Sequence, residues 1–314
     1  MPEQIAMREA FGQTLVALGK RVPELVVLDA DVSPSTRSVL FAQAFPERFI
    51  QAGIAEQNMV GMAAGLSTLG FIPFTATFAC FAAKRNLDQI RIVVAQPRTN
   101  VKITGHYAGL FAGKTGKTHL SIQDVAIMRC MPNMTVIAPA DGVEVAKAME
   151  VMVAVHGPMY LRLARDPGPV IFDQSYRFEL GKAVRLREGS DVALISTGTQ
   201  TPRTLEAADM LKAEGIAASV LHVPTLKPLD VDAIVAAADR TGLVVTAEEH
   251  SILGGLGGAV AEVLSEHRPT PVLRVGVKDV NAESAPNDDL LKRYGLTARH
   301  VADAARAHLA KWRR

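Results

Sequence analysis

The sequence is poor in cysteine and in long hydrophobic runs, and each shortage excludes a class of protein. Its two cysteines, Cys80 and Cys130, lie in apolar surroundings and indicate neither a disulfide framework nor a cysteine metal site. No apolar run approaches the roughly 18 residues that a membrane span needs. Residues 1–8 carry charges where a signal peptide would need an apolar stretch. We therefore expect a cytoplasmic protein that does not contact a membrane.

The sequence also lacks an excess of charge of either sign. Lys and Arg number 34 against 32 Asp and Glu, a formal net charge of +2. This balance gives no electrostatic reason to expect a nucleic acid as a partner. Hydrophobic residues make up 48% of the chain, so a large core can form, and 314 residues suggest two domains.

Short apolar runs rich in β-branched residues alternate with amphipathic segments of helical period along the whole chain. This alternation predicts an α/β protein made of two doubly wound domains with mainly parallel sheets. The expected strands are 25–28, 71–74, 100–103, 134–137, 158–161, 192–196, 218–222, 241–246 and 271–274. The expected helices cover about 4–18, 56–67, 82–94, 122–129, 142–155, 201–214, 231–237, 255–265 and 298–311. Asp141 is the expected N-cap of the helix that starts at residue 142.

A polar stretch with several Pro and Gly residues interrupts the pattern between residues 166 and 190. It predicts a first domain over 1–170, a linker over 171–190 and a second domain over 191–314.

A glycine-rich loop, Gly-Lys-Thr-Gly-Lys-Thr at 113–118, resembles a phosphate-binding P-loop. It fails the motif because Phe111 or Ala108 stands where the first glycine is required. Two cations beside His119 leave two readings open, an anion-binding loop and an ordinary exposed loop. The eight histidines show no ligand spacing, so we expect no metal held by this chain.

Glu56 opens a predicted helix directly after an apolar segment. A carboxyl group in apolar surroundings has its charged form disfavoured, which suits a proton-relay acid. An acidic residue in a first helical turn is also simply favourable for the helix dipole. Taken alone, the pattern favours this second reading.

An ordered set of motifs resembles the transketolase family. Its pyrimidine-binding half is matched by Gly-Ile-Ala-Glu-Gln at 53–57, Thr-Phe-Ala-Cys-Phe at 77–81, His106, Gly-Lys-Thr-His-Leu at 116–120 and Leu-Ala-Arg-Asp at 163–166. Ser-Thr-Gly-Thr at 196–199 and Ala-Glu-Glu-His-Ser-Ile-Leu-Gly-Gly at 247–255 resemble the transketolase C-terminal domain. The resemblance covers nearly the whole chain and implies a pyrimidine-binding domain followed by a transketolase C-terminal domain.

One family motif is missing. Transketolases hold the diphosphate of thiamine diphosphate through Mg²⁺ (or Ca²⁺) with a Gly-Asp-Gly motif, and this chain contains none. The resemblance therefore implies that an N-terminal transketolase subunit carries the diphosphate domain and the metal. It further implies an α2β2 heterotetramer, with this chain inactive on its own.

The resemblance also assigns roles at the cofactor. Glu56 would hydrogen-bond the aminopyrimidine, and Phe78 and Phe81 would flank that ring. Ile54 would help shield Glu56 from water, and Asp31 matches an acidic position near the subunit and cofactor interface.

At the substrate, Arg8, Ser35 and Arg165 match the family positions that bind the sugar phosphate, where guanidinium groups suit phosphate oxygens. His106 and His119 match histidines near the donor hydroxyls and the reacting carbon. The second domain offers only His250 as a possible match to a catalytic residue, and we assign that domain to assembly.

Three departures from the family pattern concern specificity. Thr115 stands at an acidic position that bonds a sugar hydroxyl, Lys117 at a proline, and Lys84 at an aromatic residue. Added cations and a lost anion make the pocket more positive. We hypothesise a specialised substrate, such as a branched ketose phosphate or a more anionic sugar.

Other functions remain open at this stage. The β subunit of a 2-oxo acid dehydrogenase shares the glutamate and the two-domain plan, but the loop around His119 and the phosphate residues favour a transketolase. A 1-deoxyxylulose 5-phosphate synthase is normally one long chain. A catalytically silent scaffold subunit and a simple ligand-binding module are the non-enzymatic alternatives.

Overall fold

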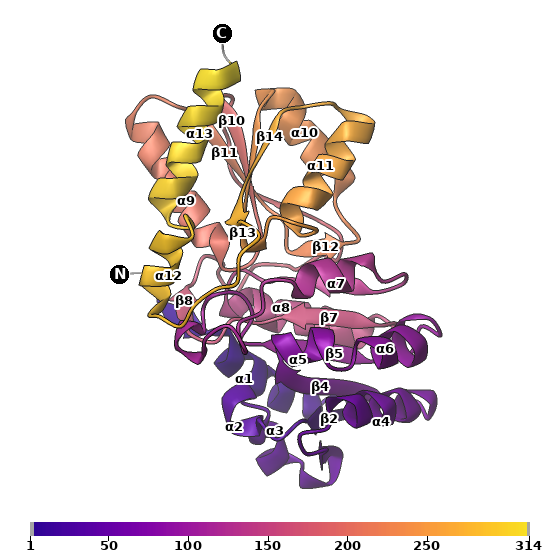
Figure 1. The fold of residues 1–314 in the computed structure, drawn as a ribbon. Coiled ribbons are helices and arrows are strands. Elements are labelled where there is room, and N and C mark those ends of the chain that lie inside the picture. Colours follow the sequence, from indigo (N-terminus) through magenta and orange to yellow (C-terminus); the bar gives the residue numbers. More distant parts are fainter. Residues whose placement is uncertain (1–2, 313–314) are drawn as a thin grey trace.

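Two mixed sheets lie end to end in residues 3–312, the part of the chain that this computed structural model describes. Helices cover both faces of each sheet, and the chain builds most of the first sheet before it begins the second (Figure 1). The predicted α/β class with mainly parallel strands is confirmed. Every helix within residues 3–312 is too short or too polar to cross a membrane.

The first sheet has the strand order β12-β6-β7-β5-β4-β2-β3. Its strands are β2 (Leu25–Asp29), β3 (Phe49–Gln51), β4 (Ile72–Phe78), β5 (Lys102–His106), β6 (Thr135–Ile137), β7 (Met159–Arg162) and β12 (Thr225–Lys227). All neighbours pair in parallel except β12, which comes from the second half of the chain and lies antiparallel to β6. Because helices cover both faces, β2 and β5 are buried along their whole length.

The helices of this half divide between the two faces. One face packs against α1 (Met7–Gly19), α3 (Val39–Ala44) and α8 (Gly142–Ala154). The other face packs against α4 (Glu56–Thr68), α5 (Ala79–Lys84) and α7 (Asp124–Cys130), together with a π-helical segment over Ile90–Ala95. Short helices α2 (Ser33–Thr36) and α6 (Leu87–Gln89) lie in the connections.

The second sheet has the order β14-β13-β10-β11-β9. Its strands are β9 (Val184–Arg187), β10 (Val192–Ser196), β11 (Ala218–His222), β13 (Val244–Ser251) and β14 (Val272–Val277). Helices α9 (Gln200–Ala213) and α13 (Ala298–Trp312) pack together on one side, and α10 (Val231–Thr241) and α11 (Leu256–His267) on the other (Figure 1). The short α12 (Asn287–Arg293) precedes α13.

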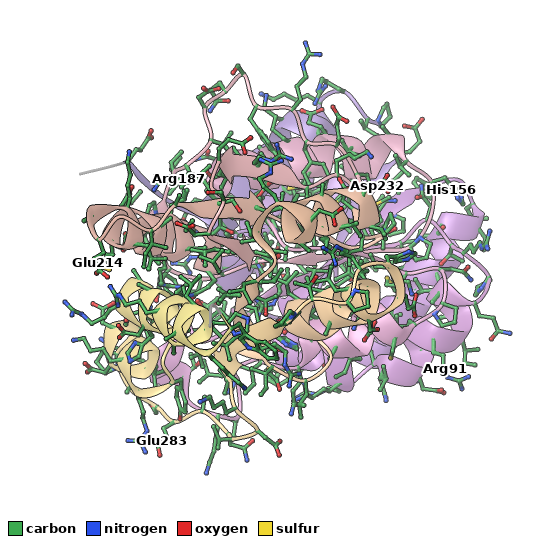
Figure 2. All side chains as sticks on the ribbon, turned by 90° about the horizontal axis from the view of Figure 1, so that it is seen from above. Arg91, His156, Arg187, Glu214, Asp232 and Glu283 are labelled. Atoms are coloured by element: carbon green, nitrogen blue, oxygen red, sulfur yellow. The ribbon has the colours of Figure 1, made fainter. Side chains whose placement is uncertain are left out.

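Charged side chains project outward from both halves. Figure 2 shows Arg91, Glu214 and Glu283 pointing away from the ribbon, and all three are exposed. This arrangement leaves the apolar side chains to form the cores between sheets and helices.

Two predicted helices of the first half differ from the structure. The helix expected over 4–18 begins at Met7, because Gln4–Ala6 forms β1, which pairs antiparallel with β8 (Pro167–Pro169). The helix expected over 82–94 is interrupted at Asn86, whose backbone leaves helical geometry, and it continues as a π-helical segment.

Two strands of the second half also differ. The segment predicted as a linker contains β9, which pairs antiparallel with β11 at an edge of the second sheet. The strand expected over 241–246 runs on to Ser251, so three ionisable residues, 248–250, are buried. These residues find partners in distant segments, which the strand pattern alone does not reveal.

Buried polar side chains join the two halves. The predicted N-cap Asp141 is confirmed: its Oδ1 accepts from the Glu144 backbone N–H at 2.8 Å, and its Oδ2 accepts from Phe172 N–H at 2.9 Å. Across the junction, Glu144 Oε2 lies 2.8 Å from His222 Nε2, and both side chains are fully buried.

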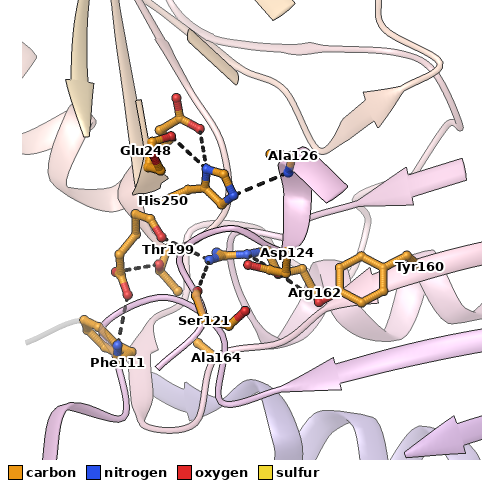
Figure 3. A network of polar contacts seen from close by, with 12 residues as sticks. Phe111, Ser121, Asp124, Ala126, Tyr160, Arg162, Ala164, Thr199, Glu248 and His250 are labelled. Atoms are coloured by element: carbon orange, nitrogen blue, oxygen red, sulfur yellow. Dashed lines mark hydrogen bonds and ion pairs between the residues drawn. The ribbon is translucent and has the colours of Figure 1, made fainter. Parts of the chain in front are cut away.

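Arg162, at the end of β7, forms the second connection between the halves (Figure 3). Its Nε donates to Asp124 Oδ2 at 2.8 Å, and its Nη2 donates to the carbonyl oxygens of Ser121 at 3.3 Å and Glu249 at 3.0 Å. The Tyr160 hydroxyl donates to the same Asp124 oxygen at 2.8 Å. Burial acts to raise the pKa of Asp124, but the Arg162 charge and these hydrogen bonds hold it below the usual value.

We predict that Asp124→Asn strongly destabilises the protein, because it leaves the buried Arg162 guanidinium without its counter-charge. The expected loss is about 3–5 kcal/mol in the free energy of unfolding, measured by denaturant titration. The matched control is Asp88→Asn, which removes an exposed ion pair with Arg91 and should cost less than about 1 kcal/mol. Equal effects of the two substitutions would contradict the role given to Arg162.

Candidate active site

The sequence-predicted site residues gather at one edge of the first sheet. Phe78 and His106 end β4 and β5, Asp31 and Arg165 follow β2 and β7, and Glu56 starts the helix after β3. Because parallel strands bring their carboxyl ends to the same edge, residues far apart in the sequence meet there.

Glu56 is the first residue of α4 and is 2% exposed. Arg85, which follows α5, donates from Nη1 to both carboxylate oxygens, at 2.7 Å to Oε1 and 2.9 Å to Oε2. The central carbon of the Arg85 guanidinium, Cζ, lies 4.0 Å from the centroid of the Phe81 ring. Sequence reasoning missed Arg85; the basic pair that it forms with Lys84, just after the two phenylalanines, was the available signal.

The shielding expected around Glu56 is only partly present. Met59 and Val60 are fully buried, but Ile54 is 74% exposed in this chain, so its expected shielding role is not seen. Ile54 follows Gly53, whose positive φ of 72° turns the chain before α4 begins. In place of an apolar cover, the Arg85 guanidinium balances the charge of the buried carboxylate.

Four rings form a cluster beside Glu56. The Phe78 centroid lies 6.0 Å from Phe81 and 4.3 Å from Tyr107. The His119 ring meets Phe78 and Phe81 edge-on at 5.9 Å and 5.3 Å. Tyr107 was not anticipated from the sequence. The Phe78 and Phe81 rings, tilted by 36° to each other, give the site aromatic faces on which a planar ring can stack.

Two arginines meet at Tyr107. Arg8 Nη1 donates to the Tyr107 hydroxyl at 3.4 Å and to the Ser35 carbonyl at 3.3 Å, and the Arg165 guanidinium lies 5.2 Å from the Tyr107 ring centroid. Within residues 3–312, the buried Nε atoms of Arg8 and Arg165 have no hydrogen-bond partner. Ser35 contributes its backbone rather than its hydroxyl to these contacts. Arg165 Nη1 also lies 3.6 Å from Asp166 Oδ1. The two guanidinium groups at Tyr107 together form a candidate anion site.

A buried carboxylate orders the loop that carries Asp31 and Ser35. Asp29 Oδ1 accepts from the Val32 N–H at 2.6 Å, and Oδ2 accepts from the Ser38 hydroxyl at 2.8 Å. Burial raises the pKa of Asp29, and these hydrogen bonds act against the rise. Asp31 itself is exposed at this edge, and its N–H donates to Gln51 Oε1 at 2.8 Å.

His106, which the resemblance places near the donor hydroxyls and the reacting carbon, is enclosed in this chain. Its side chain is fully buried, with its ring edge-on to Phe11 at 4.7 Å and its Nε2 3.1 Å from Thr104 Oγ1. Burial and the nearby Arg8 charge lower the pKa of His106 to about 3, so the ring is neutral near pH 7. His106 faces the core because β5 is covered on both sides.

The residues that depart from the family pattern separate in space. Lys84 and Lys117 line one cavity of about 330 Å³, together with Phe81 and Arg85. Thr115 does not line it, and its hydroxyl donates to the Ala112 carbonyl at 2.6 Å. The two added cations therefore act on one cavity, while the threonine hydroxyl serves the fold of its own loop.

The second domain holds the loop that carries Lys117 and His119. Glu249 Oε1 accepts from the backbone N–H groups of Leu110 at 2.7 Å and Phe111 at 2.9 Å. A Cβ at Gly109 would lie only 2.4 Å from this oxygen, and Gly109 has a φ of +73°. The loop can therefore pack against Glu249 of the second domain only with glycine at position 109.

His250, the one catalytic candidate of the second domain, lies at the domain junction. Its Nε2 accepts from the Ala126 N–H at 3.4 Å (Figure 3). Its Nδ1 lies 2.8 Å from the Ser251 carbonyl oxygen. The side chain is buried in these contacts, so it supports the junction and does not line the cavity beside Phe81.

A second cavity, of about 480 Å³, opens between the domains. Asp166, Arg203 and Asn287 are among its lining residues, and none of the predicted site residues lines it. We therefore place the candidate site at the ring cluster and Glu56.

Two family profiles match consecutive parts of the chain. The profile of the transketolase pyrimidine-binding domain matches residues 3–169, and that of the transketolase C-terminal domain matches residues 181–301.

Similar proteins match over nearly their full length. A candidate transketolase C-terminal section of Methanocaldococcus jannaschii is 45% identical over 299 residues, which cover 94% of each chain. A 6-deoxy-6-sulfo-D-fructose transketolase subunit of a Clostridium species is 43% identical, with 96% of this chain and 94% of that protein covered.

Among solved structures, a split-gene transketolase described as an inactive β4 tetramer matches with a TM-score of 0.90 and 50% identity. The match covers 98% of this chain and 99% of the other. The chain therefore belongs to the transketolase family, as a subunit that carries the pyrimidine-binding and C-terminal domains.

Proposed function

We propose that this chain is the second subunit of a two-chain, thiamine diphosphate-dependent transketolase. The enzyme would transfer a two-carbon ketol group between a ketose phosphate and an aldose. The observation that carries the proposal is the buried Glu56 carboxylate, whose partner Arg85 lies over the ring of Phe81.

The residues present fit the aminopyrimidine half of the cofactor. A carboxylate that accepts hydrogen bonds beside an aromatic face suits a flat ring bearing N–H donors. The Arg85 guanidinium, itself flat and rich in N–H groups, already makes both contacts. When bound, thiamine diphosphate supplies the electron sink for the transferred fragment.

The roles of this chain's own residues follow from their positions. Glu56 would hold a proton at the pyrimidine edge, and Phe78 and Phe81 would orient the ring and exclude water. His119, at the edge of both phenylalanine rings, would contact the reacting end of the sugar. His106, neutral and buried, would support Tyr107 and Arg8 from behind rather than touch the substrate.

The diphosphate and its Mg²⁺ or Ca²⁺ would lie on a partner subunit, because the family's Gly-Asp-Gly motif is missing from this sequence. The similar split-gene structure, described as inactive and composed of β chains only, supports a requirement for a second chain. We propose an N-terminal transketolase subunit as the partner and α2β2 as the assembly.

The substrate we propose is an anionic sugar. Arg8 and Arg165 offer a phosphate site beside Tyr107, and Lys84 and Lys117 add positive charge to the cavity beside Phe81. The Clostridium relative is named for a sulfonated sugar, which fits the same preference for an anion. A 2-oxo acid dehydrogenase subunit, the main alternative, would not need the paired arginines.

Replacing Glu56 tests the proposed chemistry. In the mixture with the partner, Glu56→Gln should lower kcat for ketol transfer by about a hundredfold or more, because an amide cannot take up a proton as the carboxylate does. The isosteric amide preserves shape, and size-exclusion chromatography checks that assembly persists. Full activity of the variant would contradict the assignment. If the unmodified mixture instead decarboxylated a 2-oxo acid, the dehydrogenase alternative would be favoured.

Removing the two added cations tests the substrate class. In the same mixture, Lys84→Ala/Lys117→Ala should raise KM for a ketose phosphate or sulfonate roughly tenfold, about 1.4 kcal/mol, and leave KM for the neutral ketose nearly unchanged. The wild-type preference for the anion should fall as salt rises. Lys20→Ala, an exposed lysine at the end of α1, is the matched control. An equal effect on both sugars would contradict an anion-binding role.

A further inference from the structure

One guanidinium contacts both groups that the cofactor ring is expected to use. Arg85 donates to the two oxygens of Glu56 at 2.7 Å and 2.9 Å and lies 4.0 Å from the Phe81 ring centroid. The Glu56 side chain is 1% exposed, while that of Arg85 is 43% exposed. The arginine therefore reaches in from the surface and covers the carboxylate.

The guanidinium and an aminopyrimidine present the same chemistry to this surface. Both are planar, carry N–H donors in the plane and stack on aromatic faces. Each would place a donor at the Glu56 carboxylate and a flat face on Phe81. Two planar groups cannot occupy one place, so the observed position of Arg85 and a bound ring exclude each other.

We propose that Arg85 is a gate that occupies the aminopyrimidine position of the free chain and must leave when the cofactor binds. The inference rests on the proposed function and extends it to control of cofactor entry. The Arg85 side chain is partly exposed and lines the cavity of about 330 Å³, which gives it a place to move.

In the chain without its partner, Arg85 supplies the counter-charge that the buried Glu56 carboxylate needs. A buried carboxylate without a counter-charge is strongly destabilising, and Arg85 is the only cation that forms an ion pair with Glu56 among the described residues. The arginine thus stabilises the empty site, and the cofactor ring must compete with it. The apparent affinity for the cofactor ring equals the affinity of the open site multiplied by the fraction of chains in which that site is open.

The test uses the full chain without a partner and a fragment as the probe, 4-amino-5-hydroxymethyl-2-methylpyrimidine. Its dissociation constant is measured by ligand-observed NMR and calorimetry. Arg85→Met should tighten binding about tenfold or more, because it uncovers Glu56 and Phe81. Arg91→Met, which alters an exposed arginine paired with Asp88, should leave the dissociation constant unchanged.

A second variant tests the gate even if Arg85→Met does not fold. Arg85→Lys keeps a charge for Glu56 but lacks the flat face over Phe81, and it should tighten binding by a smaller factor. Circular dichroism checks that both variants fold.

Unchanged, weaker or undetectable fragment binding in the folded variants would overturn the gate, since the guanidinium would then belong to the ring's own binding site. The measurement needs no partner and no turnover. Failure of the gate is therefore distinguishable from failure of the proposed function, which the Glu56→Gln assay reports.

Discussion

The buried charge of Arg162 is the interaction on which the arrangement of the two halves depends. Its guanidinium donates to Asp124 at the start of α7 and to the carbonyl oxygens of Ser121 and Glu249. One side chain thus joins a helix, the loop that carries Lys117 and His119, and the second sheet. With β13 fixed in this way, the Glu249 carboxylate meets the backbone at Leu110. The positions of Lys117 and His119 follow, because both lie on the loop held at these points. The second domain therefore shapes the site.

Charge compensation also explains the form of the site itself. Glu56 is buried at the start of α4, where the Arg85 guanidinium pairs with its carboxylate. Arg8 and Arg165 both contact Tyr107, another ring of the cluster, and their buried Nε atoms have no hydrogen-bond partner among the described residues. The charge of Glu56 is thus balanced within the chain, while Arg8 and Arg165 form the candidate site for an anion. This contrast fits a site in which the sugar brings its own negative charge.

Sequence patterns predicted most strands of the two sheets, because alternating apolar runs and amphipathic helices are local signals, but they missed the edge strands β3, β9 and β12. They also placed Glu56 at the start of its helix and Asp141 at its cap, since both depend on neighbours a few residues away. The contact between Arg85 and Glu56 joins residues 29 positions apart, and that between Glu249 and Leu110 joins residues 139 apart. Such pairs depend on side-chain direction and domain packing, which no local pattern encodes. The burial of His106 was missed for the same reason, because α1 covers β5 from far away in the sequence.

The central claim is that half of a cofactor site lies on this chain and is completed by another. Calorimetric titration of thiamine diphosphate with Mg²⁺ into this chain, into the partner and into their mixture tests it most directly. We expect tight, saturable binding in the mixture alone, with the two chains in equal number. Equally tight binding to this chain by itself, or none in a mixture that does assemble, would contradict it.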